Sequence, residues 1–216
     1  KEMPDEFHNA PYFGTYYYGI NMTKEPLGKN LALRKALALA IDRDILTQKI
    51  TQGGELPAYS WVPPGVPGYV QQKMEGADLT QSEREALAKK YYADAGFGPD
   101  NPLKVDLLYN TSDNHRKIAI AVAAMWNKVL GVKASLTNQE WKVYLDTRGQ
   151  RQYEVVRAAW IGDYLDPSNF MEQFMESSGE ANDLGYNNST HDELLRQAQV
   201  TADVATRMKE LQDAEA

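Results

Sequence analysis

Two opposite charges flank the end of a strand-like segment, V-V-R-A-A-W-I-G-D-Y-L-D-P, at residues 155–167. The small and β-branched residues predict a strand, and Gly162 breaks it into a loop that holds Asp163 and Asp166. Arg157 lies near the end of this strand, and Asp163 comes just after it. A cation and an anion a few residues apart suit a ligand that carries both signs. A free peptide or an amino acid is such a ligand.

The two aspartates of this loop have a second interpretation, as a catalytic pair of carboxylates. Asp166, however, precedes Pro167 and a helical run. That order is typical of an N-cap followed by proline at the first helical position. Asp163 has no such structural explanation. Arg157 shares its strand face with apolar neighbours, where a charge is more often paired or functional than idle.

A second polar loop, N-T-S-D-N-H-R at residues 110–116, also follows a predicted strand. His115 falls in the first turn of the next helix, where the helix dipole disfavours a protonated imidazole. It is either a surface neighbour of the helix cap or a hydrogen-bond donor to a ligand carboxylate.

Alternating periodicities predict the elements that position both loops, in the order βαβαβ over residues 103–160. The strands are expected at 103–109, 132–137 and 153–160, with helices at 114–130 and 141–148. This order implies parallel strands joined by adjacent right-handed crossovers. Ligands bind beyond the carboxyl ends of such strands, which is where both polar loops lie.

The rest of the chain predicts one further strand, several helices and one irregular loop. The aromatic run at 11–22 predicts a strand, and four prolines and two glycines predict a loop over 57–68, packed on the surface. The expected helices begin at Asn30, at Asp42 and at two capping boxes, Ser82 with Glu85 and Thr190 with Glu193, the last helix running over 190–216.

Composition excludes several classes of protein. The chain has 216 residues, 43% of them hydrophobic and 25% charged, with a net charge of -7 and no cysteine. The acidic balance argues against a nucleic-acid partner. The lack of cysteine excludes disulfides and thiolate chemistry. No apolar run is long enough to cross a bilayer.

Several stretches resemble one family, the OppA/MppA-like periplasmic oligopeptide-binding proteins of ABC importers. They are Y-N-T-S-D-N-H (109–115), N-Q-E-W-K-V-Y-L-D-T-R (138–148), V-R-A-A-W-I-G-D-Y (156–164), the earlier L-R-K-A-L-A-L-A-I-D-R-D and P-A-Y. The resemblance covers nearly the whole chain. It implies an α/β fold with a mixed sheet, forming one lobe of a periplasmic-binding-protein type II fold. Residues 1–216 would be most of the C-terminal lobe of a two-lobed receptor.

The resemblance also implies roles for particular residues. Asp163 would pair with the α-ammonium of a peptide, and Arg157 and His115 would meet the carboxylate of short peptides. The main chain around Ala159 and Ile161 would bond the peptide backbone as an added strand.

Three further residues would line side-chain pockets by the same resemblance, namely Trp141, Trp160 and Arg148. Taken from the sequence alone, each tryptophan is more often core than pocket, and Arg148 at a helix end is a solvated residue. Two positions depart from the family pattern. Ile161 stands where enteric relatives often have a disulfide cysteine, and Thr51 stands where some relatives carry a lysine that meets longer peptides.

The expected function is therefore peptide binding without catalysis, cofactor or metal, as the periplasmic or lipid-anchored component of an ABC importer. The expected partners are short peptides, an inner-membrane permease and the N-terminal lobe of the same receptor. Two alternatives stay open. One is a specialised receptor of the same fold for murein peptide, a metal chelate or a sugar, and the other is a hydrolase that uses Asp163 and His115.

Overall fold

A four-stranded mixed sheet organises the computed structural model, which describes residues 12–216. Its strands, in the spatial order β1-β4-β2-β3, are β1 (Gly14–Ile20), β4 (Val155–Ile161), β2 (Lys104–Asn110) and β3 (Lys133–Gln139). β2 is parallel to β3 and β4, whereas β1 is antiparallel to β4. The mixed sheet and the strand predicted over 11–22 are confirmed, although Pro11 lies outside the described residues.

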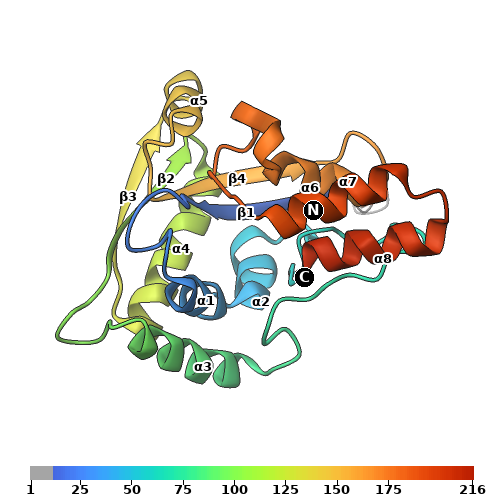
Figure 1. Cartoon of the computed structure of the whole chain (residues 1–216). Helices are drawn as coiled ribbons and strands as arrows, with labels where there is room; N and C mark the ends of the chain where they lie inside the picture. Colours follow the sequence, from blue (N-terminus) through green and yellow to red (C-terminus); the bar gives the residue numbers. More distant parts are fainter. Residues whose placement is uncertain (1–11) are drawn as a thin grey trace, which may run out of the picture.

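Helices surround the sheet on both faces (Figure 1). They are α1 (Leu31–Leu39), α2 (Arg43–Ile45), the π-helix η2 (Leu46–Thr51), α3 (Gln81–Asp94), α4 (Asp113–Leu130), α5 (Trp141–Gly149), α6 (Ser168–Met171), the 3-10 turns η3 (Glu172–Phe174) and η4 (Glu176–Ala181), α7 (Ser189–Val200) and α8 (Val204–Glu215).

The βαβαβ core is confirmed, but its two crossovers run in opposite directions. The first, through α4, joins neighbouring strands, whereas the second, through α5, passes β2 and places β4 on its far side. The prediction that both crossovers join adjacent strands is therefore wrong for the second one. The reversal makes the boundary between β2 and β4 the switch point of the sheet, where α/β proteins bind ligands.

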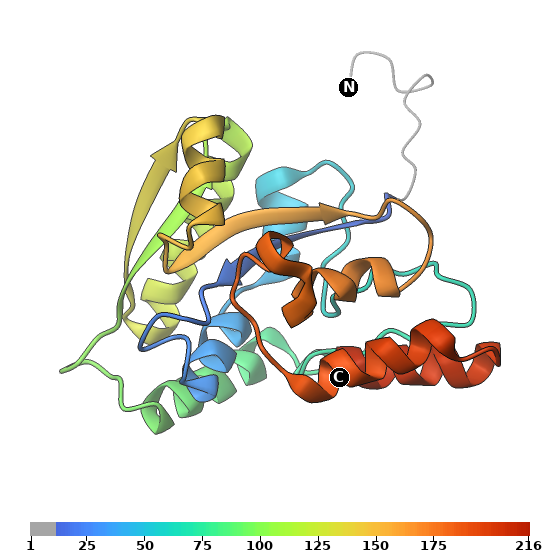
Figure 2. The ribbon, with the colours of Figure 1, turned by 45° about the horizontal axis from the view of Figure 1, so that its top comes forward.

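Alternation along the strands separates the core into layers. Val105, Leu107 and Tyr109 of β2 pack with α1, α3 and α4 on one face of the sheet. Leu108 points to the other face, where Tyr144 of α5 is fully buried. Figure 2 shows β4 and β1 running on together beyond this region, towards α6, α7 and α8.

Two helix starts differ from the predicted ones. The helix α3 is capped by Thr80, with Glu83 closing the capping box, rather than by Ser82 with Glu85. Arg84, in the first turn of this helix, is buried and donates hydrogen bonds to loop carbonyls such as Ala77 O (3.3 Å). The helix predicted from Thr190 begins instead after Asn188, whose side chain accepts from two backbone amides.

The single helix predicted over 190–216 is wrong, because the chain turns between α7 and α8. The side chain of Asp203 accepts from Thr206 N (2.8 Å) and so caps a new helix. The two helices pack against each other and bury Leu195 and Leu211 in a second core.

The loop over 57–68 has no helix or strand, as predicted, but it is part of this second core rather than a surface segment. Val62 is fully buried. The Glu215 carboxylate accepts hydrogen bonds from Trp61 N (2.7 Å), Val62 N (2.8 Å) and the Tyr69 hydroxyl. Because the last turn of α8 supplies this carboxylate, the irregular loop and the final helix hold each other in place.

We expect Glu215→Ala to destabilise the fold by about 1–3 kcal/mol, since hydrogen bonds to a charged group are lost and two amides are left without a partner. Glu180→Ala is the control, because Glu180 is exposed. Thermal unfolding followed by circular dichroism measures both variants. Equal transition temperatures for the two would contradict the role given to Glu215.

Candidate functional site

β4 runs on beyond its pairing with β2, and we call the strand edge that this leaves open, with the residues at its two ends, the crevice. These strands pair only at Leu107 with Val155 and at Leu108 with Val156, while β4 continues to Ile161. Along the rest of β4, the edge that faces β2 has no strand partner within residues 12–216. The sheet therefore offers an open strand edge at its switch point.

The register with β1 determines which backbone groups reach this edge. Asn21 N donates to Glu154 O (3.0 Å), and Gly162 N donates to Phe13 O (2.9 Å). In an antiparallel pair the bonded residues alternate, so the even-numbered residues of β4 bond to β1. The N–H and C=O groups of Ala159 and Ile161 therefore point to the open edge. Ile161 is also 52% exposed.

The inner end of the crevice, next to the paired residues of β2 and β4, holds the guanidinium of Arg157, which has no counter-ion within residues 12–216. Arg157 lies over the ring of Tyr16 (4.6 Å to the centroid) and donates to Asn110 Oδ1 at 3.3 Å. No ion pair within residues 12–216 involves Arg157, and its Nε is buried without a hydrogen bond. A partly buried cation of this kind is a receptor for an anion.

His115 joins the same group from the first turn of α4. Its Nδ1 lies 3.4 Å from the Tyr16 hydroxyl. Burial, and then the nearby charge of Arg157, lower the pKa of His115 to about 4. The imidazole is therefore neutral at pH 7 and can donate a hydrogen bond without adding a second charge.

The outer end of the crevice, just beyond the last residue of β4, holds Asp163. Its side chain is exposed, and no ion pair or side-chain hydrogen bond of its carboxylate occurs within residues 12–216. Its backbone N–H donates to Asn169 Oδ1 (3.2 Å), which also accepts from Trp160 Nε1 (3.0 Å). Gly162 is needed here, because a Cβ would lie 2.4 Å from the Phe13 ring.

Asp166 has a structural role at the start of α6, as the sequence predicted, but the N-cap is Pro167 and the helix begins one residue later than expected, at Ser168. Its carboxylate accepts from Ser168 N (3.0 Å) and forms a bidentate ion pair with Arg207 (2.8 and 2.9 Å). Burial raises the pKa of Asp166, but the bonds to Arg207 and Ser168 outweigh it and lower the pKa overall. With Asp166 occupied, Asp163 does not form a pair of free carboxylates with it.

The three predicted pocket residues occupy different environments. Trp141 is 50% exposed and stacks on Tyr144 (5.6 Å between centroids). Trp160 is half-buried against the second core. The expectation that Arg148 is solvated is wrong, because its side chain is only 17% exposed and forms an ion pair with Asp183.

Sequence reasoning missed four contributors to this region, namely Tyr16, Asn110, Tyr144 and Asn169. Asn110 stands in the polar loop that drew attention to His115, so that signal was available. The other three depend on contacts between distant segments. An example is the Tyr144 hydroxyl, which donates to the carbonyl of Arg157.

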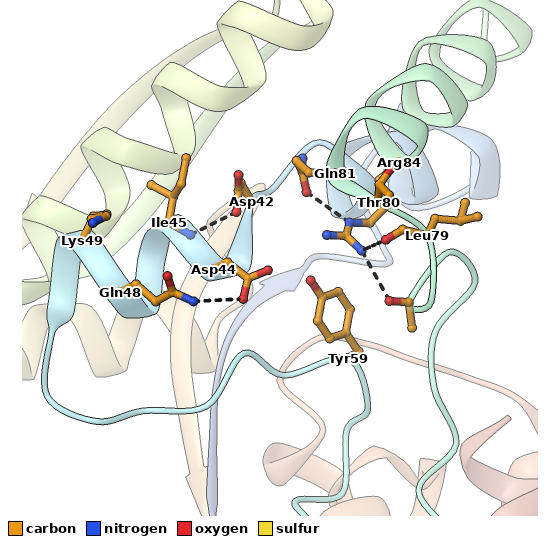
Figure 3. Close-up of a pocket in the computed structure, with 11 residues that line it drawn as sticks. Asp42, Asp44, Ile45, Gln48, Lys49, Tyr59, Leu79, Thr80, Gln81 and Arg84 are labelled. Carbon is orange, nitrogen blue, oxygen red and sulfur yellow. Dashed lines mark hydrogen bonds between the residues drawn. The ribbon is translucent and has the colours of Figure 1, made fainter.

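A separate cavity of about 450 Å³ lies between η2, the loop around Tyr59 and the start of α3 (Figure 3). Arg84 stacks on Tyr59 at 5.1 Å and donates its hydrogen bonds to the surrounding loop. Asp42 and Asp44 face the same space but bond to Ile45 N and to Gln48. These groups hold the local fold, and none of them belongs to the crevice.

Residues 12–216 contain neither a cluster of metal ligands nor a helix able to cross a membrane. No group of three or more His, Asp or Glu side chains comes together in a way that could hold a metal ion. No helix in this part of the chain has the length and apolar character needed to span a membrane.

The sequence profile of the bacterial extracellular solute-binding proteins, family 5 middle region, matches residues 1–182. The chain belongs to this family. It is 45% identical over 207 residues to the periplasmic oligopeptide-binding protein OppA of Salmonella typhimurium, covering 96% of this chain and 38% of that protein. It is 41% identical over 215 residues to the periplasmic murein peptide-binding protein MppA of Escherichia coli, covering 100% of this chain and 40% of that protein.

A solved structure confirms the family fold. The murein tripeptide binding protein MppA of Escherichia coli superposes with a TM-score of 0.92 at 40% identity, covering 99% of this chain and 42% of that one. The predicted family and fold class are therefore confirmed. The chain spans about two fifths of the length of these relatives.

We expect the His115 imidazole to titrate with a pKa of about 4. Because the charge of Arg157 lowers this pKa, Arg157→Leu should raise it. Because the folded-state pKa lies below the ordinary value of 6.5, the unfolded chain binds the proton first as the pH falls. The contribution of His115 to the free energy of unfolding is therefore complete above pH 6.5 and is lost as the pH falls towards 4. A pH titration by NMR measures the pKa. A pKa near 6.5 in both proteins would contradict this account of the partly buried His115.

Proposed function

We propose that residues 1–216 form the C-terminal lobe of a two-lobed receptor that binds short peptides outside the cytoplasm for an ABC importer. The receptor would be periplasmic or lipid-anchored, and its partners would be a permease of the inner membrane and its own N-terminal lobe. The proposal includes peptide binding and no catalysis.

The observation that carries this proposal is the open edge of β4 with opposite charges at its two ends. Ala159 and Ile161 present backbone groups of the kind that pair with an added strand. Main-chain pairing binds any extended peptide, whatever its side chains. The names of the relatives, an oligopeptide-binding and a murein peptide-binding protein, support the same class of ligand.

The charges match the two ends of a free peptide. In this proposal Asp163 pairs with the α-ammonium, and Arg157 with His115 binds the carboxylate. The six steps along the chain from Arg157 to Asp163 span at most about 20 Å at roughly 3.3 Å per residue. In this proposal both side chains bind within this interval, so an extended peptide that fills it has fewer than about six residues.

Side-chain pockets complete the proposed site. Trp141 offers an exposed aromatic surface, and Trp160 lies beside the open edge. Arg148 is the weakest of the three assignments, because Asp183 already occupies its charge. Arg148 contributes to the proposed pocket through Tyr17, whose hydroxyl lies 3.4 Å from its Nη2.

The hydrolase alternative has less support. His115 bonds within the Arg157 end of the crevice, whereas Asp163 follows the other end of β4. A general base and its carboxylate partner must lie within hydrogen-bond reach of each other. These two residues instead stand at opposite ends of the strand edge.

Asp163→Asn in the full-length receptor should weaken the binding of peptides with a free amino terminus by about 2–5 kcal/mol, because a desolvated ammonium loses its counter-charge. N-acetylated peptides, which bind weakly already, should change little. Asp146→Asn on α5 is the control for the lost charge, since Asp146 is exposed. Calorimetry that gives equal losses for free and acetylated peptides would contradict the assignment.

Replacing Arg157 and His115 together with alanine should reduce affinity most for the shortest peptides. Only a short backbone ends where these two side chains can meet its carboxylate. Affinities measured for peptides of two to six residues test this expectation. A uniform loss at all lengths would show that the pair does not bind the carboxylate.

A receptor specialised for murein peptide is the second candidate, and the similarity to MppA favours it. Mass spectrometry of the compounds that co-purify with the full-length receptor separates the two. A mixture of peptides supports the general receptor, and one defined murein fragment supports the specialised one.

The isolated 216 residues should fold, because the βαβαβ unit has its own core, but they should bind short peptides no better than about millimolar. Exposed ion pairs contribute only about 0–1 kcal/mol each, and association costs at least about 4 kcal/mol. The second lobe would supply the missing desolvation by closing over the ligand. Tryptophan fluorescence, run beside the full-length receptor, measures both affinities. Micromolar binding by the isolated chain would mean that this lobe holds a complete site.

A further inference from the structure

One buried amide oxygen connects the two residues at the outer end of the crevice. Asn169 is 7% exposed, and its Oδ1 accepts from Trp160 Nε1 (3.0 Å) and from Asp163 N (3.2 Å). Both partners are donors, so the oxygen of the amide must face them, and its orientation is fixed by the network.

The two hydrogen bonds to this oxygen bridge the end of β4. Trp160 is in the strand, Gly162 breaks it, and Asp163 is the first exposed residue of the loop. The next residues, Tyr164 and Leu165, are 50% and 58% exposed and give the loop little packing. The position of Asp163 relative to the strand edge therefore depends on few contacts, and the bond to Asn169 is one of them.

Asn169 is itself held firmly. It belongs to α6, in which the neighbouring Phe170 and Met171 are buried in the second core. Its backbone N–H donates to Asp166 O (3.3 Å), and Asp166 is fixed by the ion pair with Arg207. The amide is thus an anchored point from which the loop can be oriented.

We propose that Asn169 is a positioning residue for the amino-terminal end of the ligand. It holds the Asp163 backbone and the Trp160 indole in one arrangement, so that the Asp163 carboxylate and the Trp160 ring face the same end of the open edge. This inference rests on the proposed peptide-binding function. It adds a residue that contacts no ligand but determines how strongly the receptor prefers a free amino terminus.

The test compares Asn169→Leu with Asn169→Asp in the full-length receptor. Leucine has a similar volume but cannot accept a hydrogen bond, whereas aspartate keeps the acceptor oxygens. Asn187→Leu is the control, because Asn187 is exposed. Asn169→Ala replaces the leucine variant if the latter does not fold. The readouts are the NMR signal of the Trp160 indole N–H without ligand, and the affinities for a free tripeptide and its N-acetylated form.

We expect Asn169→Leu to shift the indole N–H signal and to weaken binding of the free tripeptide about tenfold, because the Asp163 carboxylate is then no longer held in place for the ammonium, with little change for the acetylated form. Asn169→Asp should keep the preference for the free amino terminus. In an Asp163→Asn background, Asn169→Leu should have little further effect, because its contribution acts through Asp163.

Two results would overturn the inference while leaving peptide binding intact. In one, Asp163→Asn is selective for the free amino terminus but Asn169→Leu changes neither the indole signal nor that preference. In the other, Asn169→Leu weakens free and acetylated peptides equally, which is the mark of a general structural role. If Asp163→Asn itself shows no selectivity, the proposed function fails rather than the role of Asn169.

Discussion

The central constraint on this structure is that β4 pairs along its full length with β1 but only briefly with β2. A strand held on one edge is rigid, and the other edge then presents unpaired N–H and C=O groups in fixed positions. Such an edge is a liability in most proteins because it pairs with other chains. Here the second crossover passes β2, so this edge lies at the switch point of the sheet, where a ligand can use it.

The charges at the two ends of this edge are held by different means. Arg157 is positioned by stacking on Tyr16 and by Asn110, neither of which neutralises it. Asp163 is positioned through its backbone, which leaves its carboxylate free. In contrast, the nearby Asp166 and Arg148 are both paired within the fold. Of these four charged residues, Asp166 and Arg148 are thus satisfied within the fold, whereas Arg157 and Asp163 have no ion-pair partner within residues 12–216.

The sequence predicted the features that depend on local periodicity. Alternating strand and helix patterns located the βαβαβ core, and the polar loops after two strands located both ends of the crevice. It did not predict features that need contacts between distant segments. Arg148 looked solvated because Asp183, its partner, lies 35 residues away. Tyr16 stood in the aromatic run at 11–22, but its contact with Arg157 depends on the register of β1. Asn169 gave no signal because its role depends on the packing of α6.

The errors at helix ends have a similar origin. The segment T-Q-S-E-R-E contains two overlapping capping boxes, and burial of Arg84 selects the earlier one. The segment between α7 and α8 contains no glycine or proline from Val200 to Val204. The break there comes from the Asp203 cap and from the packing of α7 against α8, which no local pattern showed.

Hydrogen exchange of individual backbone amides tests the open-edge account most directly, in the full-length receptor with and without a short peptide. The account predicts that the Ala159 and Ile161 amides exchange quickly in the free protein and become protected when the peptide binds. The Ala158 and Trp160 amides, bonded to β1, should be protected in both states. Unchanged exchange at Ala159 and Ile161 on peptide binding would contradict the claim that the ligand pairs with this strand.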